Sequence, residues 1–296
     1  MASLYTQQGK NIRKTWFLMT GFLVIVVALG WVVSQVYGNV GILYAAVAFS
    51  LVMNVTAYWF SDKIALSSTG AREADAKQYL EVHRILENLA ITAGLPKPRL
   101  YVIDDPAPNA FAAGRDPKHA VVAVTTGLLS RLDRSELEGV LAHELSHVGN
   151  RDILVMTVAV VLAGFIAIIS DMFMRMSFFG GSSRENKNPF LLVAAIAAII
   201  LAPIAAKLIQ MAVSRKREFL ADASGALLTR YPDALASALQ KISSYEAPMR
   251  RANHATAHLF ISNPFGAHEA GRFIARIFST HPPVQERIAA LTQMRV

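Results

Sequence analysis

The residues of this sequence with the clearest chemical potential are His143, Glu144 and His147, which form the pattern H-E-x-x-H. Residues spaced by four on a helix share one face, so both imidazoles would point toward the same place. Neutral imidazoles are good zinc ligands, and Glu144 would lie beside them, able to take a proton from a water molecule held by the metal. The competing interpretation is a chance match that leaves three ordinary polar side chains on a helix.

A second pair of candidate residues, Glu218 and Asp222, is also spaced by four, in the stretch SRKREFLAD. A catalytic zinc site has three protein ligands and one open position, and two histidines with one glutamate are an established set. Glu218 is therefore the candidate third ligand, and Asp222 could accept the free ring N–H of a ligand histidine. On spacing alone, an acidic pair that offsets the neighbouring Arg215, Lys216 and Arg217 explains the pattern equally well.

The segment that carries the H-E-x-x-H pattern is predicted to be a helix. Asp133 followed three residues later by Glu136 matches a capping box at its start. Apolar residues then recur at helical spacing, namely Leu137, Val140, Leu141, Leu145 and Val148. Such a helix would place both histidines of the motif on one face.

The residues before this helix are predicted to form a small sheet. Residues 71–92 are typical of a helix, and the apolar runs 100–103 and 120–125 of short strands. Between these runs a turn-rich stretch, 104–108, leads into the sequence NAFAAG at 109–114. An open sheet edge could hold an extended peptide by strand addition across the metal. Strands that merely cover the helix would produce the same pattern.

The composition indicates a membrane protein. Of the 296 residues, 53% are hydrophobic and only 17% are charged, which is too apolar for a soluble domain of this length. The absence of cysteine excludes disulfides and cysteine-ligated metal sites. The net charge of +8 comes in part from basic residues beside apolar runs, where they would meet anionic lipid headgroups. We therefore expect the lipid bilayer, and no nucleic acid, as a partner.

Four uncharged or nearly uncharged runs are candidates to enter the membrane. Residues 15–36 and 40–60 are each long enough to span a bilayer and are predicted to form an uncleaved helical hairpin. Residues 153–170 and 190–213 are predicted to form a second hairpin, which either crosses the bilayer fully or is re-entrant. Residues 174–188, between them, are predicted to be a loop.

The basic residues Lys10, Arg13 and Lys14 before the first run predict a cytoplasmic N-terminus. Each hairpin returns the chain to the side from which it started, so the remaining segments would also be cytoplasmic. The expected organisation is a membrane hairpin at 1–60, the first part of a catalytic domain at 61–152, a second hairpin at 153–213 and the second part of the catalytic domain at 214–296.

The candidate ligands lie close to predicted membrane entry points. His147 precedes Ile153 by six residues, and Glu218 follows Val213 by five. At a rise of about 1.5 Å per residue, both would lie within roughly 10 Å of the lipid. We therefore expect the metal at the cytoplasmic face of the membrane, and substrates that are membrane proteins cut close to the bilayer.

Other histidines provide rival interpretations. His254 and His258 are also spaced by four, but no carboxylate lies between them to serve as a base. His281, before Pro282 and Pro283, would be rigidly presented and could donate a hydrogen bond to an oxyanion, or could simply brace a turn.

Two functions other than proteolysis are compatible with a metal site in a membrane protein. In a non-catalytic membrane scaffold the zinc would be structural, and a structural site would take a fourth ligand from His254, His258 or His281. A divalent-metal transporter is disfavoured, because no acidic residue or histidine lies in the middle of any apolar run.

Several linked stretches, from the H-E-x-x-H motif and NAFAAG to SRKREFLAD and STHPPVQERI, resemble the HtpX-type membrane zinc metallopeptidases, which are distant relatives of the CAAX-processing peptidases. The resemblance covers nearly the whole chain. It implies a mainly α-helical membrane protein with a small β-sheet and a cytosolic, zincin-like metallopeptidase domain. It also implies an endopeptidase of the bacterial inner membrane that removes damaged or misfolded membrane proteins under stress. The four apolar runs show no sign of a larger intramembrane chamber, which argues against a prenylated protein as substrate.

The resemblance also implies roles for individual residues. One Zn²⁺ per subunit would be bound by His143, His147 and Glu218, with Glu144 as the base and Asp222 supporting a ligand from behind. The substrate would lie along an edge strand at Asn109, Ala110, Phe111 and Ala112. His281 and Arg287 would face the active site, His281 as a catalytic helper and Arg287 as a substrate contact.

Overall fold

The computed structural model describes residues 4–179, 214–251, 256–266 and 282–294. Its elements in chain order are α1 (Leu4–Tyr37), α2 (Gly41–Trp59), α3 (Ser61–Thr69), β1 (Arg72–Glu73), α4 (Leu80–Thr92), β2 (Arg99–Ile103), β3 (Ala110–Ala113), η1 (Pro117–His119), β4 (Val121–Thr125), α5 (Thr126–Arg131), α6 (Arg134–Gly149), α7 (Asp152–Phe179), α9 (Arg215–Thr229), α10 (Pro232–Ser243), η2 (Ala257–Leu259) and α12 (Val284–Thr292). The predicted fold class, mainly helical with a small sheet, is confirmed.

The sheet has four strands in the order β1-β2-β4-β3. Strands β2 and β4 are parallel, whereas β1 and β3 run antiparallel to their neighbours. The predicted strands at 100–103 and 120–125 correspond to β2 and β4, with boundaries that differ by one residue. The NAFAAG sequence forms β3, which is therefore an edge strand, as expected.

The predicted helix at 71–92 begins nine residues later than expected, because two local features exclude helical structure from its first part. Arg72 and Glu73 pair with β2 as strand β1. The carboxylate of Asp75 then accepts hydrogen bonds from the backbone N–H groups of Lys77 and Gln78, which closes a turn. The apolar spacing therefore corresponds to a helix only from Leu80, the first residue of α4.

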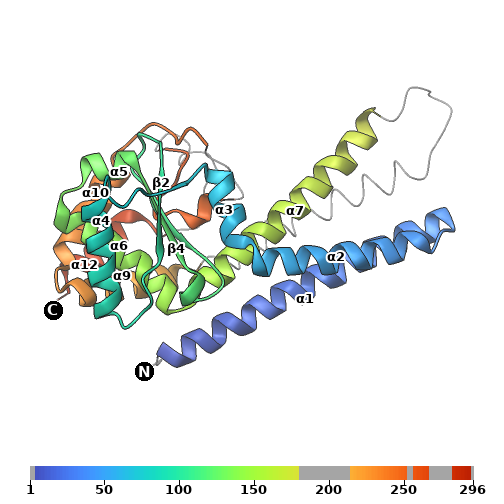
Figure 1. Cartoon of the computed structure of the whole chain (residues 1–296). Coiled ribbons are helices and arrows are strands. Elements are labelled where there is room, and N and C mark those ends of the chain that lie inside the picture. Colours follow the sequence, from blue (N-terminus) through green and yellow to red (C-terminus); the bar gives the residue numbers. More distant parts are fainter. Residues whose placement is uncertain (1–3, 180–213, 252–255, 267–281, 295–296) are drawn as a thin grey trace.

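Both faces of the sheet are covered (Figure 1). One face packs into a core that it shares with α4 and α6, and α10 covers the far side of α6. The strand residues in this core are the alternate ones, Leu100, Val102, Ala110, Ala112, Val122 and Val124. The other face packs against α3, the first half of α7 and the segment around Phe260 through Phe111, Ala113, Val121 and Ala123. Because successive residues in a strand point to opposite faces, β3 contributes to both cores.

Three helices in the described part of the chain are long and apolar enough to cross a membrane. Helices α1 and α2 contain the first two predicted runs and extend side by side away from the sheet (Figure 1). Only 28% and 17% of their most apolar windows are buried within the protein, against 72% for α7. The apolar sequence of α7 is therefore largely matched by protein contacts, whereas α1 and α2 leave most of their apolar surface open.

Helix α7 also extends further than predicted, because residues 174–179 continue it instead of beginning a loop. Arg175 and Asp171, one turn apart on this helix, form an ion pair at 2.7 Å that accommodates both charges. The fourth apolar run, 190–213, lies outside the described residues.

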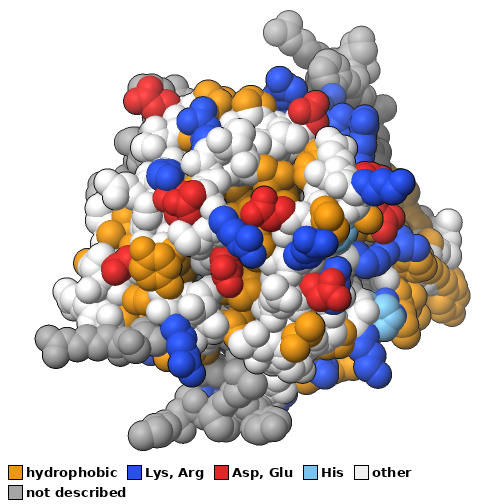
Figure 2. All heavy atoms as spheres, turned by 60° about the vertical axis from the view of Figure 1, so that its left-hand side comes forward, with side chains coloured by type: hydrophobic (Ala, Val, Ile, Leu, Met, Phe, Trp, Pro, Cys, Tyr) orange, Lys and Arg blue, Asp and Glu red, His pale blue; other side chains and the backbone are white. Residues whose placement is uncertain are grey.

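The domain around the sheet differs from the hairpin in the side chains that it exposes. Figure 2 shows the side that faces left in Figure 1, away from the tips of α2 and α7, and charged side chains of both signs are spread across it. By contrast, large apolar residues are exposed along the hairpin, among them Trp16, Phe17, Val24, Tyr44, Leu51 and Val55. This division is the one expected between a solvated domain and helices that face lipid.

Candidate metal centre

Helix α6, which carries His143 and His147, is fixed at its first turn by the predicted capping box. Asp133 Oδ1 accepts the N–H of Glu136, and Glu136 Oε2 accepts the N–H of Asp133, both at 2.9 Å. Glu136 also binds Ser237 Oγ at 2.6 Å and Lys241 Nζ at 2.6 Å, both on α10. The start of α6 is therefore anchored to a neighbouring helix.

Helix α9 approaches α6 closely enough to bring Glu218 to the two histidines, and Gly225 makes this approach possible. A Cβ atom at Gly225 would lie 2.9 Å from the backbone nitrogen of His143, closer than real Cβ contacts. The absence of a side chain therefore lets the two backbones touch. Glu218, almost two turns earlier on α9, then faces the motif helix.

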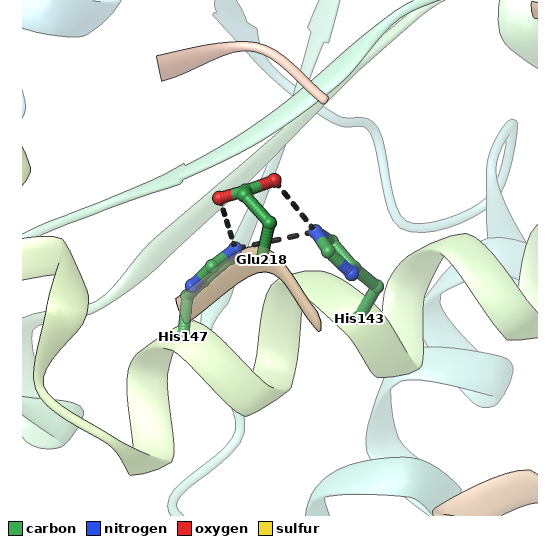
Figure 3. A group of neighbouring side chains, drawn as sticks. All are labelled: His143, His147 and Glu218. Carbon is green, nitrogen blue, oxygen red and sulfur yellow. Dashed lines mark hydrogen bonds and ion pairs between the residues drawn. The ribbon is translucent and has the colours of Figure 1, made fainter. Parts of the chain in front are cut away.

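The side chains of His143, His147 and Glu218 converge on one point (Figure 3). The two Nε2 atoms lie 3.2 Å apart, and the Glu218 oxygens lie 3.6 Å from His147 Nε2 and 3.9 Å from His143 Nε2. Ligands about 2.0–2.2 Å from one tetrahedral ion lie roughly 3.3–3.6 Å from one another. All three residues are buried, and their spacing and atom types fit a single zinc-sized ion.

Behind the first histidine, His143 Nδ1 contacts Asp222 Oδ1 at 2.9 Å. Asp222 is in turn bound by Arg287 of α12 through two hydrogen bonds, from Nε at 2.8 Å and from Nη2 at 2.7 Å. Burial alone would raise the pKa of Asp222, but the interactions with Arg287 and His143 outweigh it and lower that pKa. Asp222 is therefore a carboxylate at neutral pH.

Behind the second histidine, His147 Nδ1 contacts Asp152 Oδ2 at 3.1 Å. Asp152 is the first residue of α7, and its other oxygen accepts a hydrogen bond from Asn11 of α1 at 2.7 Å and lies 3.5 Å from Arg217 Nε. Sequence reasoning missed both residues. An acidic residue five positions after the motif was the available signal for Asp152, whereas no pattern marks Asn11.

These carboxylates determine how the two histidines bind protons. Burial lowers the pKa of His143, and Asp222 offsets this only in part, so the ring is neutral at neutral pH. Burial also lowers the pKa of His147, but Asp152 and Glu218 more than compensate and raise it to about 9. Without a metal, His147 therefore holds a proton at the point where the three ligands meet, and a metal would displace it.

Glu144 lies on α6 between the two histidines and is 2% exposed. The backbone N–H of Ala112 in β3 donates to its carboxylate. Burial, together with the charge of Glu218, raises the pKa of Glu144 to about 7, although His147, Arg287 and the Ala112 hydrogen bond oppose the shift. A carboxyl group with a pKa near neutrality is suited to take and return a proton.

The residues predicted to bind substrate lie in or next to β3, and part of its open edge is occupied by the chain itself. Ile261 N–H donates to the carbonyl of Ala110 at 2.9 Å, and Phe111 packs edge-on against Phe260. The Asn109 amide binds both the N–H and the carbonyl of Ser262. The roles of Asn109, Ala110, Phe111 and Ala112 toward a substrate stay predictions.

The remaining predicted residues divide into two groups. Arg287 is at the site and fully buried, and besides Asp222 it contacts the Ile261 carbonyl at 3.2 Å and Glu218 at 3.7 Å. A direct contact of Arg287 with substrate stays a prediction. His254 and His281 lie outside the described residues, and His258 is a buried residue of η2. Within the described ranges, the group of side chains that could hold a metal is His143, His147 and Glu218.

Comparison with known proteins agrees with this geometry. The profile described as "Peptidase family M48" matches residues 76–295. The chain is 47% identical over 302 residues to a "Protease HtpX homolog" from Caldanaerobacter subterraneus subsp. tengcongensis, which covers 99% of each chain. It is 48% identical over 283 residues to a protein of the same description from Pyrococcus furiosus, which covers 95% of each.

Among solved structures, the fold is similar to that of S. mikatae Ste24p, with a TM-score of 0.53 and 19% identity. The match covers 89% of this chain but 62% of that one, so this chain spans less than two thirds of the Ste24p structure. At this level of identity the likeness bears on the fold alone.

Proposed function

The chain belongs to peptidase family M48, whose members are metallopeptidases, and we propose that it is a zinc-dependent endopeptidase that cleaves damaged or misfolded membrane proteins at the cytoplasmic face. The observation that carries this proposal is the convergence of His143, His147 and Glu218 beside the buried carboxyl group of Glu144.

His143, His147 and Glu218 would hold one zinc ion, and their donor set is an established one for catalytic zinc. When bound, zinc lowers the pKa of a coordinated water toward about 7 and polarises a peptide carbonyl. Asp222 and Asp152 keep the two imidazoles turned with Nε2 toward the ligand position, because each accepts the Nδ1 hydrogen.

Glu144 is the proposed base. Its carboxylate would take a proton from the attacking water and deliver it to the leaving amine, a transfer that requires a pKa near the working pH. From the family resemblance we further propose that His281 donates to the developing oxyanion.

The proposed substrate lies extended along the open edge of β3. Because the Ala110 carbonyl is already bonded to Ile261 and the Ala112 N–H to Glu144, strand addition would use the Ala112 carbonyl at the end of β3, next to Glu144. This places the scissile bond on the side of the edge strand that faces the motif helix.

The position of the membrane is supported by exposed aromatic residues at both ends of the hairpin. Trp16 and Trp59 lie at the end near the catalytic domain, and Tyr37 and Tyr44 at the far end. Trp16 and Tyr37 are about 31 Å apart along α1, close to the thickness of a bilayer core. Asn11, which bonds the metal centre, precedes Trp16 by five residues, so the proposed active site lies just outside the near interface.

The same features support a proposal for the side of the membrane on which the catalytic domain lies, and for the membrane in which the protein is found. Lys10, Arg13 and Lys14 precede Trp16, at the end of α1 that is close to the catalytic domain. Their positive charge favours a cytoplasmic catalytic domain in a multi-pass protein. With the family resemblance, this supports a role in protein quality control at the bacterial inner membrane.

The test is proteolysis of unfolded casein by the detergent-purified full-length protein, with metal content measured in parallel. We expect wild type to cleave, chelation to abolish cleavage and zinc to restore it. Glu144→Gln should keep the metal and lose activity by about 10³-fold or more, because the base is removed. The matched control is Glu138→Gln, the same substitution on the same helix at a half-buried position away from the ligands.

A fully active Glu144→Gln enzyme would refute the proposed mechanism. Stoichiometric zinc without cleavage of casein or of an unfolded membrane protein would instead favour the non-catalytic scaffold with a structural metal.

A further inference from the structure

The N-terminal membrane helix reaches the metal centre through a single buried amide. Asn11 of α1 is 2% exposed and lies 141 positions before its partner Asp152. Its Nδ2 group donates to Asp152 Oδ1 at 2.7 Å and to the Asn150 carbonyl at 3.0 Å. Both partners belong to the junction between α6 and α7, immediately after the ligand His147.

The two oxygens of the Asp152 carboxylate have different partners. Oδ2 contacts His147 Nδ1 at 3.1 Å, whereas Oδ1 binds Asn11 and has Arg217 Nε at a longer 3.5 Å. A carboxylate held at one oxygen can still rotate about its last bond. The hydrogen bond from Asn11 therefore fixes the plane of the Asp152 carboxylate, and with it the direction of the His147 ring.

A neighbouring residue provides an internal reference for this contact. Gln8, one turn before Asn11, donates through its side-chain amide to the Gly149 carbonyl at 2.8 Å. Gln8 thus joins the same two helical segments with the same chemical group, but it donates to a backbone carbonyl and not to Asp152. If both contacts only packed α1 against the domain, replacing Gln8 or Asn11 would have the same effect on metal binding.

We propose that Asn11 is a positioning residue of the metal centre, which acts on the ligand His147 through Asp152 and makes the docking of α1 a condition for tight metal binding. The inference rests on the proposed function only in that the site binds a metal. It assigns α1 a role besides membrane anchoring, because any change that moves α1 relative to α7 would loosen one of the three ligands.

The experiment measures metal affinity in the full-length protein by competition with a chelator, independently of proteolysis. We expect Asp152→Asn to weaken zinc binding by about 10- to 100-fold. Asn11→Ala should weaken it by about 3- to 10-fold, the value of one hydrogen bond, and Gln8→Ala by less than about 2-fold. Alanine is favourable in a helix, so both alanine variants should fold.

Two further measurements separate positioning from general loosening. The visible absorption of the Co²⁺-substituted protein should change in Asn11→Ala and stay like wild type in Gln8→Ala, while the thermal midpoints of the two variants fall by similar amounts. In the Asp152→Asn background, Asn11→Ala should add little to the loss of affinity, because both act along one path.

Equal affinities and spectra for Asn11→Ala and Gln8→Ala, or fully additive losses with Asp152→Asn, would overturn the inference. The proposed function fails separately: a wild type that binds metal without cleaving would refute proteolysis, while a selective loss of affinity in Asn11→Ala would still support the positioning role.

Discussion

The two candidate ligand histidines of α6 both contact a carboxylate through Nδ1, yet different regions of the molecule support them. His143 is backed by Asp222 and Arg287, from the helices α9 and α12 of the catalytic domain. His147 is backed by Asp152 and Asn11, from the apolar helices α7 and α1. The candidate metal centre thus has a domain half, supported by Asp222 and Arg287, and a membrane half, supported by Asp152 and Asn11 of the apolar helices.

The two halves also differ in strength. Arg287 binds Asp222 through two charge-assisted hydrogen bonds in a fully buried pair. Asp152 instead accepts one short hydrogen bond from the neutral Asn11, and its charged neighbour Arg217 lies at a longer 3.5 Å. Charge-assisted bonds are roughly twice as strong as neutral ones. The domain half therefore holds His143 more rigidly than the membrane half holds His147.

The largest expected effect comes from breaking the domain half. Arg287→Met should lower the free energy of unfolding by about 3–5 kcal/mol, because the buried Asp222 carboxylate loses its charged partner and keeps only the contact with the neutral His143. Denaturant unfolding of the detergent-solubilised protein would measure this loss.

The control for Arg287→Met is Lys241→Met, which removes an ion pair with Glu136 whose lysine is 45% exposed. A half-exposed pair should contribute less than about 1 kcal/mol. Equal losses in the two variants would mean that the domain half is no more rigid than a surface contact.

A smaller effect is expected where the two helices that supply the ligands touch. Gly225→Ala would place a methyl group 2.9 Å from the His143 backbone, so α9 must move away from α6 and carry Glu218 with it. Overpacking of this kind costs about 1–3 kcal/mol, and metal affinity should fall as well.

Thermal unfolding and chelator competition would detect both consequences of Gly225→Ala. The matched variant is Gly21→Ala on α1, where no described atom lies within 4 Å of the added carbon. Unchanged metal affinity in Gly225→Ala would show that the close approach of α6 and α9 does not position Glu218.

The smallest expected effect is a pH dependence at Glu144, between the two halves. Burial raises the pKa of Glu144 to about 7. Because the carboxylate is the active form of a base, kcat/KM should be full above this pKa and fall about tenfold per pH unit below it. Since a bound cation favours the carboxylate, the acid limb should lie at or below about pH 7. A profile that rises toward acid would exclude Glu144 as the base.

The sequence allowed the domain half to be predicted better than the membrane half. The capping box at Asp133, the H-E-x-x-H motif and the pair Glu218 and Asp222 are local patterns, in which helical geometry relates residues only three or four apart. The contact between α6 and α9 follows from chemistry alone, because three ligands must meet.

The features that sequence reasoning missed depend on contacts between distant residues or on competing local structure. Asn11 and Asp152 are brought together by the packing of α1 on α7, which no periodicity records. The β1 strand replaced the start of a predicted helix because pairing with β2 and the Asp75 turn outweighed apolar spacing. The bond of Ile261 to Ala110, which occupies part of the predicted substrate edge, is likewise a long-range contact.

The order in which these supports appear along the chain has a consequence for biosynthesis. The two histidines and Asp152 are translated long before Arg287, which lies on α12, the last helix of the described residues. A nascent chain therefore contains the H-E-x-x-H motif well before Arg287 is available to bind Asp222. The contacts behind His147, all made by residues up to position 152, can therefore form earlier in synthesis than the contacts behind His143.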